Sequence, residues 1–364
     1  MTRWARAPPG GALVARGGGE PAADDEVFDG DAVFRFLVEE AGLGRAGALK
    51  AKDKVPQLHN YSVEGKLAPR HKYLVEEAGL GWAGAAKAIT RWPLVLGFSV
   101  RRNLRPAGRF LVEELGLGKD GAAKLITTYP AVLGYSVEYN IAPKVRYLEE
   151  ELGLGRDGAV TVITKYPQVL GMSVDNTLAP KMRYLAEEVG LGRGGAAKVI
   201  TGCPSVLGMS VEDNIALKVS YLAEEVGAGR EGAADIILAH PTLLNLSIDR
   251  KLRPTLRFVE EHFPDTNAAK LVWLASYSLA GRLMPRVRLL RRHDQAGRLA
   301  ASTMAVRTSA TFCEMVGVTT EEYDAEVAAC VREHAEMTHP SSEAGIGIGA
   351  EAGGAGAGAR EIDG

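Results

Sequence analysis

Basic side chains recur at one position of a repeating sequence pattern, and they are the residues best suited to chemistry in this chain. The interval is 37 residues, with one loss of six, and seven of eight positions are basic: Arg35, Lys72, Arg109, Arg146, Arg183, Arg257 and Arg288, with Ser220 as the exception. Arginine dominates this first basic column, and its planar guanidinium group matches the geometry of phosphates and base edges. We therefore expect the column to bind a polyanion.

Two further sets of cations share the same interval. A second partial column stands two residues earlier, at Arg70, Lys144, Lys181, Lys218 and Arg286. A third set falls in the next predicted helix, at Lys50, Lys87, Lys124 and Lys198, with Arg91 and Lys165 one turn further on. Besides the first column, the candidate contacts to a nucleic acid are Lys144, Lys181, Lys218, Lys87, Lys124, Lys198, Arg91 and Lys165.

The first basic column also has a simpler interpretation as half of a set of surface ion pairs. Four residues after each of its central members stands a glutamate: Glu76, Glu113, Glu150, Glu187, Glu224 and Glu261. A basic residue before an acidic one is the weaker order for such a helical pair, which stabilises by only about 0.3–0.5 kcal/mol. This small gain does not explain the preference for arginine, so polyanion binding remains our leading interpretation.

Aromatic residues follow the first basic column directly, at Tyr73, Phe110, Tyr147, Tyr184, Tyr221 and Phe258. Stacking on bases is one possible role. Packing between neighbouring repeats is the role that we favour.

The sequence does not carry the constellations of an enzyme. Its seven histidines are scattered, and the paired glutamates recur in every repeat, as on a solvated face. The Gly-x-Gly triplets fall at predicted helix ends without a preceding strand, unlike dinucleotide-binding loops. Three cysteines without CxxC spacing argue against a disulfide scaffold and a zinc site. We expect no catalytic residues, no metal and no cofactor.

Prolines reveal the repeat that must position these side chains. Pro56, Pro93, Pro130, Pro167, Pro204 and Pro241 are each 37 residues apart, and a second series runs through Pro69, Pro106, Pro143, Pro180 and Pro254, with Leu217 in the missing place. Six residues after each first proline comes a serine, a predicted helix N-cap. The second proline falls inside that helix, where it removes a backbone hydrogen bond.

The remaining small residues predict how each repeat turns. Asn60, Gly97, Gly134, Gly171, Gly208 and Asn245 stand two residues before the serines, and we expect a left-handed backbone there. Gly-Leu-Gly then predicts the C-terminal end of the first helix. A second, shorter helix follows. Stacked helix–helix–turn units of about 37 residues predict an all-α fold, a curved α-solenoid or superhelix.

The array has predicted limits and an uneven charge. We expect a disordered or targeting segment at 1–30, the repeats at 31–316, a capping helix at 317–340 and a disordered Gly/Ala-rich tail at 341–364. Near the end of the array, Tyr277 and Ser278 fall in phase with the Tyr-Pro pair of earlier repeats, such as Tyr166-Pro167. We therefore place the loss of six residues after them. The net charge of −2 conceals a body, 31–317, with 38 basic and 30 acidic residues. No stretch approaches the ~20 apolar residues of a membrane span.

One full repeat carries a family resemblance. The segment 163–192, ITKYPQVLGMSVDNTLAPKMRYLAEEVGLG, resembles the repeat of the mitochondrial transcription termination factor (mTERF) family. The shared features are a proline followed by leucine, a serine, Leu-x-Pro-Lys and a helix that ends in Leu-Gly. The resemblance covers roughly residues 33–316. It implies a superhelix with a basic groove that binds double-stranded DNA or, in some members, RNA.

The resemblance and the basic columns lead to the same hypothesis of function. We expect a non-enzymatic organellar protein, of chloroplast or mitochondrion, that binds double-stranded DNA as a monomer and regulates or terminates transcription. One alternative is an RNA-binding factor in intron splicing or ribosomal RNA maturation. Another is a protein-interaction scaffold, in which the basic residues would be scattered around the surface.

Overall fold

The computed structural model describes residues 31–264, 266–295 and 301–338, and every regular element among them is a helix. The predicted 1–30 segment and 341–364 tail lie outside the described residues. The chain forms two compact units, Met1–Asn245 and Leu246–Gly364. We call them the N-terminal and the C-terminal unit. The expectation of an all-α fold with 37-residue repeats is confirmed.

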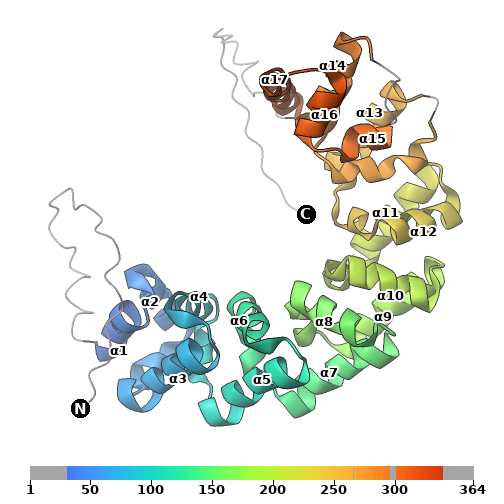
Figure 1. Cartoon of the computed structure of the whole chain (residues 1–364). Coiled ribbons are helices and arrows are strands. Elements are labelled where there is room, and N and C mark those ends of the chain that lie inside the picture. Colours follow the sequence, from blue (N-terminus) through green and yellow to red (C-terminus); the bar gives the residue numbers. More distant parts are fainter. Residues whose placement is uncertain (1–30, 265, 296–300, 339–364) are drawn as a thin grey trace, which may run out of the picture. The chain divides into compact units, whose positions relative to one another are not determined.

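Each repeat of the N-terminal unit pairs a composite first helix with a regular second helix. The central α segments of the first helices are α1 (Ala32–Arg35), α3 (Ala68–Lys72), α5 (Arg105–Arg109), α7 (Ala142–Arg146), α9 (Ala179–Arg183) and α11 (Leu217–Ser220). The second helices are α2 (Gly44–Lys54), α4 (Gly81–Arg91), α6 (Gly118–Thr128), α8 (Gly155–Lys165), α10 (Gly192–Gly202) and α12 (Gly229–Ala239). Figure 1 shows α4, α6, α8 and α10 following one another in one row, with α3, α5, α7 and α9 in another.

The serines cap the first helices as predicted. The hydroxyl of Ser62 accepts a hydrogen bond from the amide of Gly65 at 3.0 Å, and Ser173 accepts one from Asn176 at 3.1 Å. The same bond recurs at Ser99, Ser136, Ser210 and Ser247. Such a cap contributes about 1 kcal/mol and fixes the residue at which each helix begins.

Turns of π-helix flank the second proline. Pro180 lies in α9, between the π segments Val174–Leu178 and Tyr184–Glu188. The expected interruption of the α-helical pattern is therefore present. Proline is not its sole cause, because Leu217 stands in the same place and a π segment, Val211–Ala216, still precedes it.

The expectation of a left-handed backbone before the serines is wrong. Among the described residues, positive φ is confined to Asp294 and to other glycines, which do not include Gly97, Gly134, Gly171 or Gly208. These four glycines end 3₁₀ turns, and at Gly134, Gly171 and Gly208 an aromatic side chain occupies the space that a Cβ would need. A Cβ on Gly134 would lie 2.6 Å from Trp92, and one on Gly171 would lie 2.7 Å from the Tyr135 hydroxyl.

The left-handed residues are instead the predicted C-caps of the first helices. Gly190 and Gly192 have φ of 87° and 65°, and the equivalent pairs behave alike in the other repeats of the N-terminal unit. The chain thus reverses between the two helices of a repeat. Their apolar faces meet, and residues such as Leu111, Ile126 and Leu133 are buried in this stack.

The C-terminal unit begins with a shortened repeat. It contains α13 (Arg253–His262), 3₁₀ turns at Ala268–Lys270 and Val272–Ser276, α14 (Met284–Arg292), α15 (Ala301–Val306), α16 (Ser309–Val316) and α17 (Thr320–Thr338). Ser278 accepts a bond from the Gly281 amide and is thus the helix cap, not the equivalent of the first proline. The six residues are lost from the second helix, before Val272, and our placement of the loss after Ser278 is wrong.

Candidate nucleic-acid interface

The first basic column occupies one structural position throughout the N-terminal unit. Its members are the last residues of the α segments in the first helices, and all five are exposed: Arg35, Lys72, Arg109, Arg146 and Arg183. The helical register of the repeat therefore holds these cations at equal steps along the chain.

Pairing with the glutamate four residues on is found at the start of this column. Lys72 and Glu76 form an ion pair of 3.8 Å between exposed side chains. Within the described part of the chain, Arg109, Arg146 and Arg183 form no ion pair and no side-chain hydrogen bond. Surface pairing thus accounts for Lys72 but not for the three arginines.

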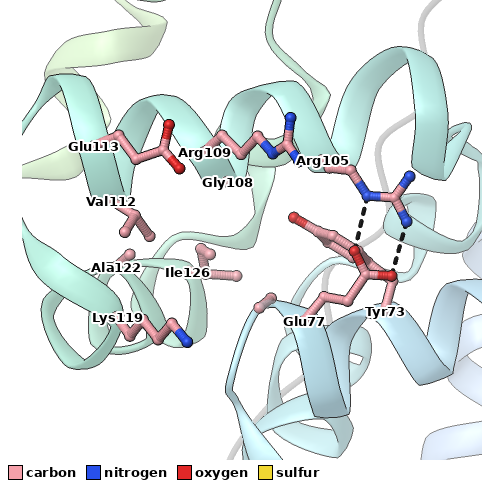
Figure 2. A pocket seen from close by; sticks show the side chains of 11 residues that line it. Tyr73, Glu77, Arg105, Gly108, Arg109, Val112, Glu113, Lys119, Ala122 and Ile126 are labelled. Carbon is pink, nitrogen blue, oxygen red and sulfur yellow. Dashed lines mark hydrogen bonds and ion pairs between the residues drawn. The ribbon is translucent and has the colours of Figure 1, made fainter.

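Arg109 lines a small pocket between two repeats, with a volume of about 150 Å³ (Figure 2). Beside it, Arg105 donates two hydrogen bonds of 2.8 Å to the Glu77 carboxylate. The hydrogen bond from Arg105 lowers the pKa of Glu77, and the charges of Arg109 and Lys72 lower it further. Burial raises the pKa of Tyr73 in the same pocket to about 12. Glu77 is neutralised by Arg105, which leaves the charge of Arg109 available.

Two lysines of the second partial column, Lys144 and Lys218, make hydrogen bonds within the protein. Lys144 donates from Nζ to the Leu170 carbonyl in the next repeat at 2.6 Å, and to Asn140 Oδ1 at 3.0 Å. Lys218 is buried and donates to Asn214. Burial lowers the pKa of Lys144, Lys181 and Lys218. We leave Lys144 and Lys218 out of the proposed binding surface, whereas half-buried Lys181, which makes no side-chain hydrogen bond or ion pair among the described residues, remains a candidate.

The second-helix cations are exposed on the other row of helices: Lys87, Arg91, Lys124, Lys165 and Lys198. The structure brings two of them together with cations of α2. Lys50, Lys54, Lys87 and Arg91 line an open depression of about 720 Å³. Lys124 lines a neighbouring one. The first basic column and the second-helix cations therefore lie on different helices. Arg109 of the column lines one pocket, whereas Lys87, Arg91 and Lys124 line other depressions.

A further basic column was missed by our sequence analysis. It comprises Arg45, Lys119, Arg156, Arg193 and Arg230, near the start of each second helix, with Trp82 in the remaining place. Its position is equally periodic, so alignment of the repeats contained the signal. Arg193 donates to the Glu150 and Glu151 carbonyls, and Arg230 to that of Glu188, at the C-terminal ends of first helices. These arginines stabilise helix ends, where cations are favoured.

The aromatic residues beside the first basic column pack between repeats. Tyr73 is buried and donates from its hydroxyl to the Leu104 carbonyl of the next repeat at 2.7 Å. Phe110, Tyr147, Tyr221 and Phe258 are buried as well. Stacking on bases would need exposed rings, so our favoured interpretation, packing, is the one that these contacts support.

The two candidates of the C-terminal unit differ in their surroundings. Arg257, in α13, is exposed. Arg288, in α14, is held by two carboxylates of α17, with its Nη1 at 3.5 Å from Glu326 and 3.0 Å from Glu333. These hydrogen bonds raise the pKa of Arg288. The last position of the column is therefore already bound to anions of the same chain.

The described residues hold no group of three or more His, Cys, Asp and Glu side chains arranged for a metal ion. Cys203, Cys313 and Cys330 are buried and free. None of the described helices has both the length and the apolar character that crossing a membrane requires.

Comparison with known proteins gives a single finding. The family model described as mTERF matches residues 50–313, whereas a search of the curated proteins found no match. Members of this family are non-enzymatic nucleic-acid-binding factors and are typically organellar. The matched segment begins within α2 and ends within α16. With most of its length matched, this chain belongs to the mTERF family.

Proposed function

We propose that this protein binds double-stranded DNA through the first basic column and regulates or terminates transcription in a chloroplast or mitochondrion. The observation that carries the proposal is the repetition of exposed arginines at Arg109, Arg146 and Arg183, which form no ion pair with any of the described residues. A guanidinium group that the protein leaves unpaired forms charge-assisted hydrogen bonds with a phosphate at little cost.

The length of the N-terminal unit suits a duplex. At the usual spacing of about 10 Å between packed helices, six second helices would span roughly 50 Å. At about 3.4 Å per base pair this corresponds to about 15 base pairs. Equal steps along the repeat favour a regular ligand such as a duplex over an irregular protein partner.

The second-helix cations, Lys87, Arg91, Lys124, Lys165 and Lys198, form a second candidate surface. The depression lined by Lys50, Lys54, Lys87 and Arg91 concentrates positive charge near the start of the array. Further along, exposed Asp235 of α12 stands at the position of Lys87. We assign these cations a supporting role, because their charge does not persist along the unit.

RNA is the second candidate ligand, in splicing or ribosomal RNA maturation. A-form duplexes are recognised by shape and by 2′-hydroxyl groups, so a matched pair of probes separates the two ligands. The protein is titrated with a 20-base-pair DNA duplex and with the RNA duplex of the same sequence, at several salt concentrations. We expect tighter binding of DNA, with affinity that falls steeply as salt rises.

Two results would overturn the proposal in different ways. Preference for the RNA duplex would replace DNA as the ligand but keep the basic surface. Equal affinity at 50 and 200 mM salt, or no binding of either duplex, would favour the protein-interaction scaffold instead. Expression of a fluorescent fusion of the full chain tests the location, which we expect to be a chloroplast or a mitochondrion.

A further inference from the structure

Helix α17 of the C-terminal unit places a row of carboxylates against α14. Glu322, Glu326 and Glu333 are four and seven residues apart, so they share one face of the helix. All three form ion pairs with arginines of α14. The acidic row therefore packs against α14, with Glu326 buried and Glu333 still exposed.

The contacts are those of a bidentate anion site. Glu333 accepts hydrogen bonds from both terminal nitrogens of Arg288. Glu326, whose side chain is only 8% exposed, accepts one from Arg292 Nη2 at 2.6 Å and also pairs with Arg288. Glu322 lies 3.0 Å from His293 Nε2 and 3.8 Å from Arg292. Two arginines thus hold three carboxylates, as they would hold neighbouring phosphates.

Arg288, which α17 contacts, occupies the same position of the repeat as the candidate binding arginines of the N-terminal unit. After the six-residue loss, Arg288 stands in the register of Arg109, Arg146 and Arg183, which are unpaired in the N-terminal unit. Helix α17 carries six acidic residues and one arginine: Glu321, Glu322, Asp324, Glu326, Glu333, Glu336 and Arg332. The helix that contacts Arg288 and Arg292 is therefore strongly acidic.

We propose that α17 is an autoinhibitory element, which occupies Arg288 and Arg292 and competes with nucleic-acid phosphates for them. This inference rests on the proposed function for the identity of the competitor. Release of α17 exchanges one bidentate anion contact for another, so the competition depends on ligand and salt concentration. The nucleic acid gains contacts to Arg288 and Arg292 when α17 is displaced.

The test compares two charge-neutralising variants of the same helix in the full chain. Glu326→Gln/Glu333→Gln removes the carboxylates that hold Arg288, and Asp324→Asn/Glu336→Gln removes two exposed ones that do not. Both change the net charge equally. We expect about three- to tenfold tighter binding of the 20-base-pair duplex by the first variant, with a salt slope steeper by about 1–2. The control is expected to remain within about twofold of the wild type.

Binding to heparin, together with a third variant, tests the autoinhibitory role of α17 independently of duplex DNA binding. On a heparin column, Glu326→Gln/Glu333→Gln should elute at higher salt than the control, whether or not the wild type binds duplexes. Addition of Arg288→Gln should cancel the gain. Equal shifts in the two double variants, or a gain that survives Arg288→Gln, would overturn the inference. A heparin shift in a protein that binds neither duplex would preserve it and refute the proposed function.

Discussion

The N-terminal and C-terminal units treat the same position of the repeat in opposite ways. In the part of the chain that the structure describes, Arg109, Arg146 and Arg183 are exposed and form no ion pair, whereas Arg288 is held by Glu326 and Glu333. The register of the repeat thus decides where a cation stands, and the neighbouring element decides whether it is available. In the N-terminal unit that neighbour is another repeat, and in the C-terminal unit it is an acidic helix.

The largest effect is expected from charge reversal in the N-terminal unit. Arg109→Glu/Arg146→Glu/Arg183→Glu should weaken duplex DNA binding by about 10²–10³-fold at 100 mM salt, because three phosphate contacts are replaced by repulsion. Fluorescence anisotropy measures the loss. The control Arg101→Glu/Arg102→Glu/Arg250→Glu reverses three exposed arginines in the first turns of first helices. An equal loss of affinity in the control would show that the column attracts DNA only through its net charge.

Removal of a paired carboxylate is expected to destabilise only the C-terminal unit. Glu326→Ala leaves Arg288 and Arg292 without their buried partner and should lower the free energy of unfolding by about 1–3 kcal/mol. Glu113→Ala, four residues after the unpaired Arg109, should change it by less than about 0.5 kcal/mol. Urea denaturation compares the two variants. An equal loss of unfolding free energy in the two variants would show that the ion pairs of Arg288 do not stabilise the C-terminal unit.

A smaller effect concerns pH and a histidine of the N-terminal unit. His71 is buried beside Phe36 and Trp82, and burial lowers its pKa to about 4. The unfolded chain binds a proton below about pH 6.5, whereas the folded chain does so only near pH 4. Stability should therefore fall as the pH drops through this window, by about 2 kcal/mol at pH 5.

The variant His71→Met tests this pH dependence with a residue that the repeat already uses. Met182 occupies the equivalent place in another first helix. In urea denaturation at pH 7 and pH 5, the loss attributed to His71 should disappear in the variant. A pH dependence that persists unchanged would assign it to other groups.

The smallest effect concerns salt and stability. Exposed ion pairs are screened as ionic strength rises, at a cost of less than about 1 kcal/mol. Amide hydrogen exchange in α14 should therefore become faster between 50 and 500 mM salt, whereas exchange in α9, which forms no ion pair among the described residues, should not. Faster exchange in both helices would show that the two units depend on ion pairs alike.

The periodic features of the fold were predictable because each depends on a few adjacent residues. Serine caps and Gly-Leu-Gly helix ends follow from local backbone chemistry, and both are confirmed. The role of Gly134 was not predictable, because its cause is Trp92 of the preceding repeat. The six-residue loss was misplaced because Tyr277 and Ser278 imitate the Tyr-Pro pair, whereas the backbone uses Ser278 as a cap.

The candidate site was predictable in position but not in availability. The spacing of Arg109, Arg146 and Arg183 located one exposed position in every repeat. The same reasoning could not separate them from Lys144, whose ammonium group bonds a carbonyl of the next repeat. It also could not find the partners of Arg288, since Glu333 lies 45 residues further along the chain. Whether a cation is free to bind a ligand depends on its contacts with other repeats and helices. The sequence of a single repeat does not show these contacts.

The most direct test of the central claim is cleavage of duplex DNA by a reagent tethered to the column. The three native cysteines are buried, so Arg146→Cys offers an accessible thiol for iron-EDTA. Gln168→Cys, exposed on the 3₁₀ turn Pro167–Gly171, is the matched control. The account predicts localised backbone cleavage from position 146 and little from position 168. Equal cleavage from both positions, or none from position 146 in a protein that still binds the duplex, would contradict it.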